Sequence, residues 1–395
     1  MNFKITKIVE TIPFQYNSIT VFDKEIAEGA QGKVFLTIDQ NFAVKIFNQD
    51  STQNCLNTLV PLIKKLKDSF KPPKNLLSHP CLHAFPICVF ECNIQNEKKF
   101  GTISKYLKNW KTLLDQNAWI RIASLEKSQK YELFHNIASC FHFFSTIGYV
   151  YVDLSWSNIL TSPTNPPQIA LLDFESGGLL HEPNSTTSTI GKKEGFEAPE
   201  IFLKNNTNRI NIYSDWWSMA VLFFIILSAG FHPFFFLKDL GNISKYVNET
   251  QWPNYNINYW KNGTDQDHDI FKNIIKDIEP EILNLFIKTF NSINNPYERT
   301  SPYVWLTTIE TILKKSYTEL PTFTHHDIKK TQIGNKKYTL IEWETKNANY
   351  VKVQLNEKSI LKLPNDKIII PDEIKEVKLI AIKSKDNFNT LKIKI

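Results

Sequence analysis

The sequence lacks several features that would assign it to a common class of exported protein. No apolar signal segment follows the first ten residues, MNFKITKIVE, so we expect a chain that stays in the cell. Five cysteines among 395 residues are an odd number and few for a disulfide framework. We therefore expect reduced thiols and a cytoplasmic location.

The charge balance also excludes one class of partner. Lys and Arg number 46 against 40 Asp and Glu, and a net charge of +6 on a chain of this length falls short of a nucleic-acid-binding signature. Residues 331–395 hold thirteen lysines and eight acidic residues, so most of the excess lies there. We expect no nucleic-acid partner; these lysines form either a solvated face or a surface for an acidic protein partner.

The one long apolar run, residues 216–236, is short for a membrane span. Its uninterrupted part covers about 16 residues, whereas a bilayer needs roughly 20. A helix that is buried on all sides in a helical domain is apolar all round as well. We predict such a buried helix, and no membrane partner.

The hydrophobic period changes twice along the chain. Residues 18–47 read as three short strands, followed by a helix over about 52–69 that is broken or kinked near Pro61, and by strands at 85–94 and 100–106. Helical spacing dominates from about 111 to 318, and short alternating strands near the end predict a β-sandwich with Trp343 in its core. The predicted divisions are a β-rich lobe 1–107, a helical lobe 108–318, a linker 319–330 and a sandwich 331–395.

Two glycines and a lysine in the first lobe suggest phosphate binding. Gly29 and Gly32, in AEGAQGKVF, lie between two strands, where absent side chains let backbone amides approach phosphate oxygens. Lys45 is the only charge in the apolar strand FAVKIF, and a buried lysine requires an anion. The alternatives are a plain hairpin turn and a lysine that reaches solvent at a strand edge.

Three polar residues in the second lobe suggest a metal and a base. Asp153 and Asn158 stand five residues apart in YVYVDLSWSNIL, and Asp173 follows the strand-like run IALL. Two carboxylates and an amide oxygen are hard ligands suited to magnesium. Asn158 and Asp173 would hold the metal, while Asp153 accepts the proton of an incoming hydroxyl.

In this order the motifs resemble the protein kinase family over about residues 18–318. The matching pieces are EGAQG, AVK, DLSWSN, DFE, EAPE with Glu200, DWWSMAV with Asp215, and NPYERT with Arg299. The resemblance implies an α+β fold of two lobes, a β-rich N-lobe and an α-helical C-lobe, and an enzyme that transfers phosphate from ATP, with Mg²⁺, to Ser or Thr of a protein substrate. The end of the chain resembles an all-β immunoglobulin-like sandwich.

The resemblance also implies roles for single residues. Gly29, Gly32, Ala43 and Lys45 would contact ATP, and Asp153 together with Lys45 would be catalytic. The family further implies that Glu200 pairs with Arg299 and that Asp215 holds the catalytic loop.

The first departures from the family concern the lysine and the metal motif. Ala27 stands where a first glycine is usual, and Glu175 takes the glycine place of the metal motif. No glutamate occurs between Phe47 and Phe90, so the usual helix partner of Lys45 is missing, and Asp50 or Asp68 would have to substitute.

The catalytic loop departs as well. Tyr151 and Val152 replace a His-Arg pair, which removes the arginine that reads a phosphorylated activation loop. Ser155 replaces a common lysine, whose charge Lys193 could supply. We therefore expect the hydroxyl run Ser185–Thr189 to be a plain solvated loop, with autophosphorylation as the alternative.

These substitutions are similar to those of a divergent bacterial kinase branch, found in tellurium-resistance-type operons beside a phosphatase and a von Willebrand factor A-type protein. Such proteins would be partners. Two other readings stay open: a pseudokinase that binds nucleotide without turnover, and a zinc site among His79, Cys81, His83, Cys88 and Cys92, against which ordinary core cysteines are the simpler interpretation.

Overall fold

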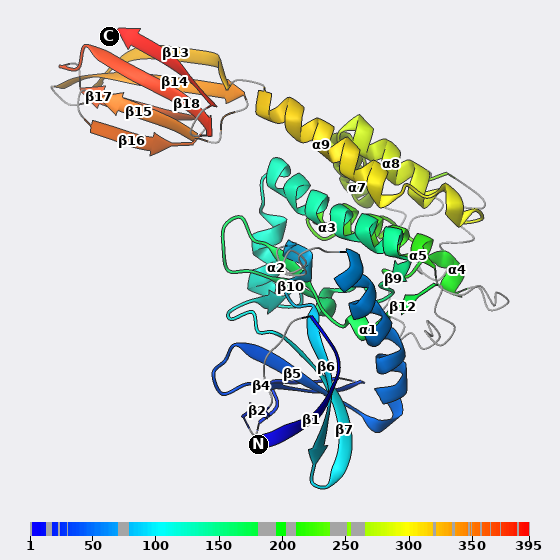
Figure 1. Ribbon diagram of the computed structural model, residues 1–395. Coiled ribbons are helices and arrows are strands. Elements are labelled where there is room, and N and C mark those ends of the chain that lie inside the picture. The colour runs from blue at the N-terminus through cyan, green and yellow to red at the C-terminus, as the bar shows by residue number, and fades with distance from the viewer. Residues whose placement is uncertain are drawn as a thin grey trace. The chain divides into compact units, whose positions relative to one another are not determined.

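The computed structural model divides into two compact units, residues 1–309 and 310–395, and the division falls within helix α9 (Pro302–Thr318). Figure 1 shows both units. The structure describes residues 2–12, 18–22, 24–29, 31–69, 79–180, 195–202, 211–237, 251–253, 265–318, 321–333, 336–346, 348, 350–355, 358–363, 365–371, 373–384 and 387–394.

The first lobe of unit one is a seven-stranded antiparallel sheet with the order β2-β1-β6-β7-β5-β4-β3. Its strands are β1 (Asn2–Thr11), β2 (Ser18–Thr20), β3 (Ala27–Gly29), β4 (Gly32–Leu36), β5 (Phe42–Phe47), β6 (Pro86–Ile94) and β7 (Glu97–Lys105). The two later predicted strands are confirmed, as β6 and β7. Residues 18–47 form four strands where three were predicted, and β2 and β3 lie at opposite edges of the sheet. Strand β1 was not predicted, although it pairs with β6 along most of its length.

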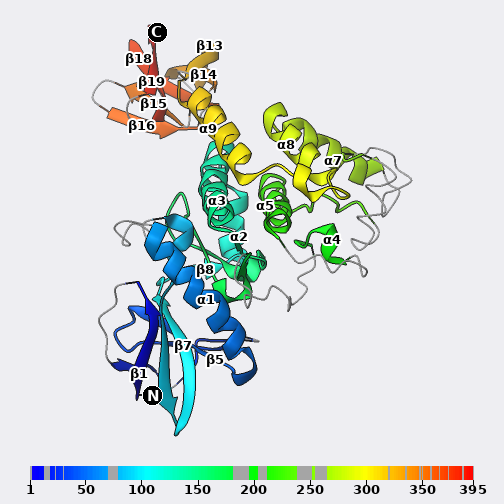
Figure 2. The same ribbon diagram turned by 45° about the vertical axis from the view of Figure 1, so that its right-hand side comes forward.

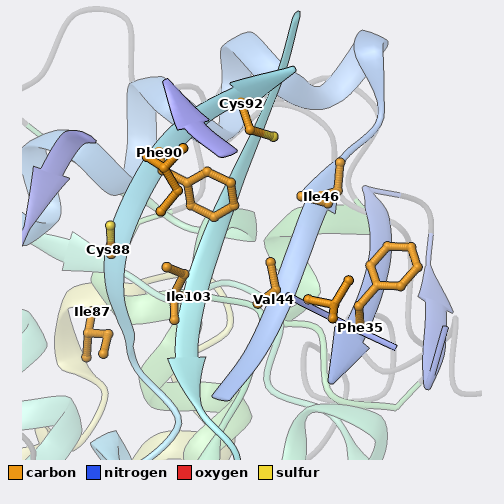
Figure 3. Packing of buried hydrophobic residues seen from close by; sticks show 10 residues of the cluster. Phe35, Val44, Ile46, Ile87, Cys88, Phe90, Cys92 and Ile103 are labelled. Carbon is orange, nitrogen blue, oxygen red and sulfur yellow. The ribbon is translucent and has the colours of Figure 1, made fainter. Parts of the chain in front are cut away.

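A buried cluster on one face of this sheet stabilises the lobe. Figure 3 shows its central members: Phe35, Val44, Ile46, Ile87, Cys88, Phe90, Cys92 and Ile103. Side chains alternate across a strand, so Val44 and Ile46 enter this core while their neighbours on β5 face the other way. The cluster fixes the position of β5, which carries Lys45.

Helix α1 (Gln49–Ser69) packs on β1, β5 and β6, and it lies beside the sheet in both views of the molecule (Figures 1 and 2). It begins three residues before the predicted start. The predicted break at Pro61 is wrong: the helix continues through this residue, since Leu59, Leu62 and Ile63 around it are fully buried and their packing outweighs the lost hydrogen bond.

The second lobe is mainly helical. Its helices are α2 (Gln116–Ala123), α3 (Lys127–Ile147), α4 (Pro199–Phe202), α5 (Ile212–Leu227), α7 (Asp265–Asp277), α8 (Pro280–Phe290) and α9. Short 3-10 turns are η2 (Pro80–Leu82), η3 (Trp156–Asn158), η4 (Phe174–Ser176) and η7 (Pro296–Glu298). Short strands are β8 (Lys111–Thr112), β9 (Tyr149–Val150), β10 (Ile159–Thr161), β11 (Ile169–Leu171) and β12 (Gly178–Leu179).

The apolar run becomes the central helix of this lobe. Twelve of the sixteen residues of α5 are buried, and aromatic rings from α3, α8 and α9 contact it, for example Phe134 stacked on Phe223 at 4.2 Å. The predicted buried helix is confirmed. Within the described ranges, no helix has the length and apolar character that crossing a membrane requires.

Unit two contains the end of α9 and two antiparallel sheets, β13-β14-β17 and β16-β15-β18-β19. Their strands are β13 (Thr322–Ile333), β14 (Lys336–Lys346), β15 (Tyr350–Leu355), β16 (Lys358–Lys362), β17 (Asp366–Pro371), β18 (Glu376–Ser384) and β19 (Asn387–Lys394). One buried cluster joins both sheets and contains Trp343 from β14 with Val351 and Val353 from β15. A two-sheet β domain with Trp343 in its core was predicted and is found.

The predicted linker 319–330 is wrong for most of its length. Residues 322–330 belong to β13, which pairs with β14 from Thr322↔Lys346 to Ile333↔Lys336. The sequence THHDIKK is polar on both sides of the strand because β13 is an edge strand with exposed side chains, so the usual alternating pattern is absent.

Candidate active site

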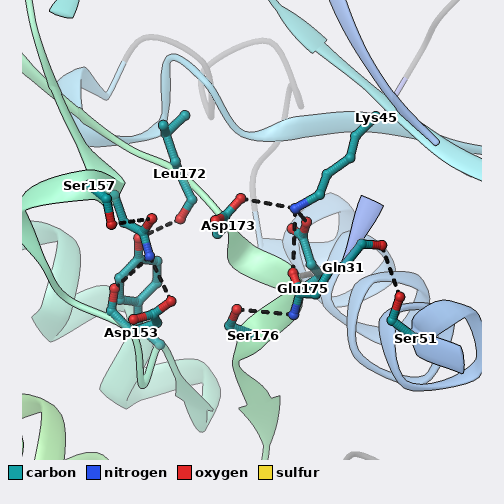
Figure 4. A network of polar contacts seen from close by, with 11 residues as sticks. Gln31, Lys45, Ser51, Asp153, Ser157, Leu172, Asp173, Glu175 and Ser176 are labelled. Carbon is teal, nitrogen blue, oxygen red and sulfur yellow. Dashed lines mark hydrogen bonds and ion pairs between the residues drawn. The ribbon is translucent and has the colours of Figure 1, made fainter. Parts of the chain in front are cut away.

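Lys45 lies on the face of β5 that points away from the lobe core. Ala43 shares this face, because it stands two residues earlier on the same strand and is half-buried like Lys45. Figure 4 shows the Lys45 ammonium reaching across to the segment around Asp173. The predicted lysine is thus not a residue that snorkels from a strand edge, since only 13% of its side chain is exposed.

Two carboxylates and one amide surround the Lys45 ammonium. Nζ lies 3.0 Å from Asp173 Oδ1, makes a direct ion pair with Glu175, and donates to Gln31 Oε1 at 3.4 Å. Burial lowers the pKa of Lys45, but the negative charges of Glu175 and Asp173 outweigh it, so the net pKa lies above its usual value. Lys45 therefore carries a positive charge at neutral pH.

Glu175 takes the place of the missing helix glutamate as the partner of Lys45. Its side chain is only 3% exposed, and it contacts Lys45 from the turn η4. The expectation that Asp50 or Asp68 would substitute is wrong: both are exposed on α1. Neither carboxylate is therefore buried with the lysine, whereas Glu175 is.

The turn η4 presents Asp173 and Glu175 to the same ammonium. Asp173 adopts a left-handed conformation (φ 53°, ψ 46°), which is uncommon for a residue other than glycine. Phe174 between them is fully buried, with its ring 4.9 Å from Phe85 and 5.6 Å from Tyr151. The buried ring anchors the turn, and its two acidic neighbours consequently face Lys45.

Asp153 and Asn158 also come together. The Asn158 side-chain amide donates to Asp153 Oδ2 at 2.7 Å and to the Asp153 carbonyl at 3.0 Å, which leaves its oxygen pointing elsewhere. The backbone N–H of Leu172 donates to the Asn158 carbonyl at 2.9 Å, so the catalytic loop is tied directly to the residue before Asp173. The four predicted residues Lys45, Asp153, Asn158 and Asp173 therefore belong to one contiguous network.

The backbone before Asp153 is strained and held in place. Val152 has φ 73°, a costly conformation for a β-branched residue that persists only where neighbours enforce it. Asp215 does so: its two oxygens accept the N–H groups of Tyr151 at 2.7 Å and Val152 at 2.8 Å. Burial raises the pKa of Asp215 to about 7, and these two hydrogen bonds oppose the rise. The expected role of Asp215 in holding the loop is confirmed.

Tyr151 explains one of the departures in the catalytic loop. Its side chain is fully buried, its hydroxyl donates to the Leu172 carbonyl, and its ring packs on Phe144 and Phe174. The residue thus links the catalytic loop to the segment of Asp173 through an aromatic contact. Ser155 is buried as well, so the position of the common lysine carries a short, uncharged side chain here.

The glycine loop contributes geometry and an unpredicted side chain. A Cβ on Gly32 would lie 2.2 Å from the Ile46 carbonyl oxygen, so the close approach of β4 to β5 requires glycine here; a Cβ on Gly29 would meet nothing within 4 Å. Gln31 donates to Ser176 Oγ at 3.2 Å besides accepting from Lys45, and its own carbonyl accepts from Ser51 Oγ at 2.9 Å (Figure 4). Gln31 thereby joins the loop to η4 and α1.

The predicted pair of Glu200 and Arg299 is confirmed. Arg299 donates through Nη1 and Nη2 to the two Glu200 oxygens at 2.7 and 2.6 Å, and through Nη1 to the Tyr213 carbonyl at 2.9 Å. The Arg299 side chain is fully buried and lies 5.2 Å over the Trp217 ring. Lys193 and the hydroxyl run Ser185–Thr189, which the sequence places between these motifs, lie outside the described residues.

The predicted zinc ligands do not gather at one place. Cys88 and Cys92 lie in the sheet core of Figure 3, and His83 packs edge-on against Trp110, so these three do not meet the other predicted zinc ligands. His79 and Cys81 do meet, joined by Cys140, with one ligand atom of each within 4.8 Å of the others.

Hydrogen bonds already occupy this second group. The His79 Nδ1 atom accepts the N–H of Cys81 at 3.3 Å, and the Cys81 thiol donates to the Asn136 carbonyl at 3.5 Å. A hydrogen-bonded core cluster fits these contacts. Metal analysis of the purified chain separates it from a zinc site with these altered ligands.

Sequence reasoning missed Gln31 and Ser176, and it noticed Glu175 without assigning a role. An acidic residue at the third position of the metal motif, together with a glutamate-free segment after Phe47, is the signal that could have paired it with Lys45. No comparable signal distinguishes Gln31 from an ordinary turn residue.

The chain was also compared with known proteins in two ways. The family model of the protein kinase domain matches residues 20–318. A search of the curated proteins found no match. The matched range covers most of the chain and contains every residue of the network described above, so the chain belongs to the protein kinase family.

Proposed function

We propose that this chain is an active ATP- and Mg²⁺-dependent protein kinase that phosphorylates Ser or Thr hydroxyls of a protein substrate. The observation that carries the proposal is the connected network of Lys45, Asp173, Asn158 and Asp153. A scaffold without catalysis has no physical need for a charged lysine, a partly exposed carboxylate and a candidate base in one network.

The side chains divide the work of phosphate transfer. Lys45 would bind the ATP phosphates, because its ammonium is charged and held by Asp173 and Glu175. Asp153 would accept the proton of the attacking hydroxyl, with its carboxylate oriented by the Asn158 amide. Gly29, Gly32 and Ala43 would contact the nucleotide from the β-sheet.

The residues fit a magnesium ion. Asp173 offers a carboxylate whose side chain is 40% exposed, and the amide oxygen of Asn158 is the end that does not contact Asp153. Both are the hard oxygen donors that Mg²⁺ prefers. When bound, the ion supplies charge neutralisation for the phosphate oxygens.

The alternative is a pseudokinase that only binds nucleotide. Its main support was the missing helix glutamate, which would leave Lys45 poorly oriented. The direct ion pair between Lys45 and Glu175 weakens that support. An increase in melting temperature with Mg²⁺ and ATP, without any turnover, would favour this alternative.

The deciding experiment measures transfer of labelled γ-phosphate by the full chain to generic protein substrates and to itself. Wild type is compared with Asp153→Asn, and with Asp68→Asn as a matched control at an exposed position on α1. We expect Asp153→Asn to lower kcat by about 10²- to 10⁴-fold and the control to match wild type. Label on serine and threonine, and not tyrosine, supports the specificity; equal label from wild type and Asp153→Asn would refute the proposal.

Partners and location extend the proposal. We infer a cytoplasmic protein with an immunoglobulin-like C-terminal domain that contacts an acidic partner, and a place beside an operon-encoded phosphatase and a von Willebrand factor A-type protein of a bacterial tellurium-resistance-type operon. Co-purification of the full chain with each candidate, compared with a chain ending at residue 318, tests these contacts.

A further inference from the structure

We propose that Glu175 is the positioning residue for Lys45, so that the lysine is oriented by the metal-binding turn η4 and not by a carboxylate from helix α1. This inference rests on the proposed function, because it concerns how the ATP-binding lysine is held. In this arrangement one turn, η4, carries both Asp173 and the carboxylate that positions Lys45.

The first argument is what α1 offers to Lys45. No glutamate occurs from residue 48 to residue 89, and Cys55 of α1 is a buried thiol, 1% exposed. Burial raises the pKa of this thiol to about 12; the charge of Glu175 adds to the rise and that of Lys45 opposes it, so Cys55 is within electrostatic reach of both. The two acidic residues of α1, Asp50 and Asp68, are exposed, and its buried Cys55 stays uncharged at neutral pH, so Lys45 has Glu175 as its buried carboxylate partner.

The second argument is that Glu175 is held rigidly. Phe174 is buried, its carbonyl accepts the Tyr149 hydroxyl and the N–H of Gly177, and its ring contacts Phe85. A Cβ on Gly177 would lie 2.3 Å from the Val150 carbonyl oxygen, so the chain after η4 packs closely on β9. The anchored backbone and the burial of the Glu175 side chain, 3% exposed, limit where its carboxylate can lie, which helps to orient a flexible lysine.

The third argument is how α1 is attached. Thr58 donates to the Gly177 carbonyl at 3.0 Å, and Ser51 donates to the Gln31 carbonyl at 2.9 Å. Helix α1 thus contacts both the metal-binding turn and the glycine loop through hydroxyl groups. Neither hydrogen bond is made by Lys45 itself, so α1 supports η4 and the glycine loop without supplying a charge to the lysine.

A charge relocation tests the proposal. We expect Glu175→Gln to lower kcat/KM for ATP about 100-fold. Cys55→Glu alone adds a second buried carboxylate beside Glu175 and should also lower it. In the double variant Cys55→Glu/Glu175→Gln, the carboxylate comes from α1, and we expect at least a tenfold recovery over Glu175→Gln. Cys55→Glu should therefore lower kcat/KM for ATP when residue 175 is Glu and raise it when residue 175 is Gln.

A matched variant and a second readout keep the test decisive. Cys55→Gln/Glu175→Gln has the same volume without the charge, and it should not recover. Recovery by both double variants, or kcat and KM of folded Glu175→Gln equal to wild type, would overturn the proposal. If wild type transfers no phosphate, the proposed function fails, but the positioning role of Glu175 can still be tested. The same four variants are then compared by their affinity for Mg²⁺ and ATP in a thermal shift. Cys55→Glu should again lower the affinity when residue 175 is Glu and raise it when residue 175 is Gln.

Discussion

Within the described residues, the kinase unit contains two buried ion pairs that join distant segments, and they differ in how exposed their carboxylates are. Arg299 and Glu200 are 0% and 10% exposed, and the guanidinium is used by both Glu200 oxygens, the Tyr213 carbonyl and the Trp217 ring. Lys45 pairs with Glu175 but also with Asp173, whose side chain is 40% exposed.

The difference follows from the chemistry of the two cations. A planar guanidinium makes a fixed bidentate contact, whereas an ammonium is a compact charge with three rotatable donors. The first suits a permanent link between α4 and the turn η7, and the second suits an exchange of protein carboxylates for phosphate oxygens. A buried ion pair is thus structural or functional according to whether one partner can reach a third group.

The largest effect should come from Lys45→Met. It leaves Glu175 buried without its opposite charge, which costs about 3 to 5 kcal/mol of unfolding free energy, and it removes phosphate transfer as well. Denaturant unfolding measures the first effect and a transfer assay the second. The double variant Lys45→Met/Glu175→Met should regain most of the stability but no transfer; a single variant as stable as wild type would contradict the comparison.

His232 is a buried titratable group that is uncharged at neutral pH, in contrast to the two ion pairs. Its Nδ1 accepts the N–H of Phe234 at 3.1 Å and its Nε2 donates to the Gly195 carbonyl at 2.7 Å, and burial lowers its pKa to about 4. Since the unfolded state binds the proton first, this contribution is complete above pH about 6.5 and is lost as the pH falls towards 4.

The expected loss is about 3 kcal/mol, from a pKa difference of about 2.5 at roughly 1.4 kcal/mol each. We would measure unfolding free energy between pH 7 and 4 in wild type and in His232→Gln. The difference between the two curves should shrink as the pH falls. Parallel curves would show that His232 does not titrate in this window.

Arg299→Lys should have a smaller effect, about 2 kcal/mol of stability, because an ammonium cannot keep the bidentate contact together with the Tyr213 carbonyl. Affinity for Mg²⁺ and ATP of the folded variant should stay within twofold of wild type, since Lys45 and Asp173 are untouched. A large loss of nucleotide affinity without a loss of stability would show that the Arg299–Glu200 pair is functional and not structural.

Thr58→Val should have the smallest effect. It removes the hydrogen bond from α1 to the Gly177 carbonyl at almost constant volume, which costs about 1 kcal/mol. Denaturant unfolding gives this value. Phosphate transfer should change less than threefold, and a loss as large as that of Glu175→Gln would show that α1 does orient Lys45.

The sequence allowed prediction wherever the signal is local and ordered. Lys45, Asp153, Asn158 and Asp173 each stand in a short apolar context that admits few polar residues, and the central helix α5 follows from its unbroken apolar run. The Glu200–Arg299 pair could be expected only from the family resemblance, since nothing within either motif points to a partner about a hundred residues away.

The rest depends on tertiary geometry. Glu175 reaches Lys45 because Phe174 is buried and Asp173 turns left-handed, and neither fact follows from the letters DFE. Strand β13 lacks an alternating pattern because it is an exposed edge. Cys140 meets Cys81 because η2 packs on α3, 59 residues further along the chain.

The burial of Phe174 has a consequence for inhibitor design. Its ring fills a site among Phe85, Tyr151 and Phe144, and the two acidic neighbours of this ring hold Lys45. A compound that displaces the ring must rotate the whole turn and break both lysine contacts at once. Screening against this protein should therefore favour compounds that bind beside Lys45 with the phenyl ring left in place.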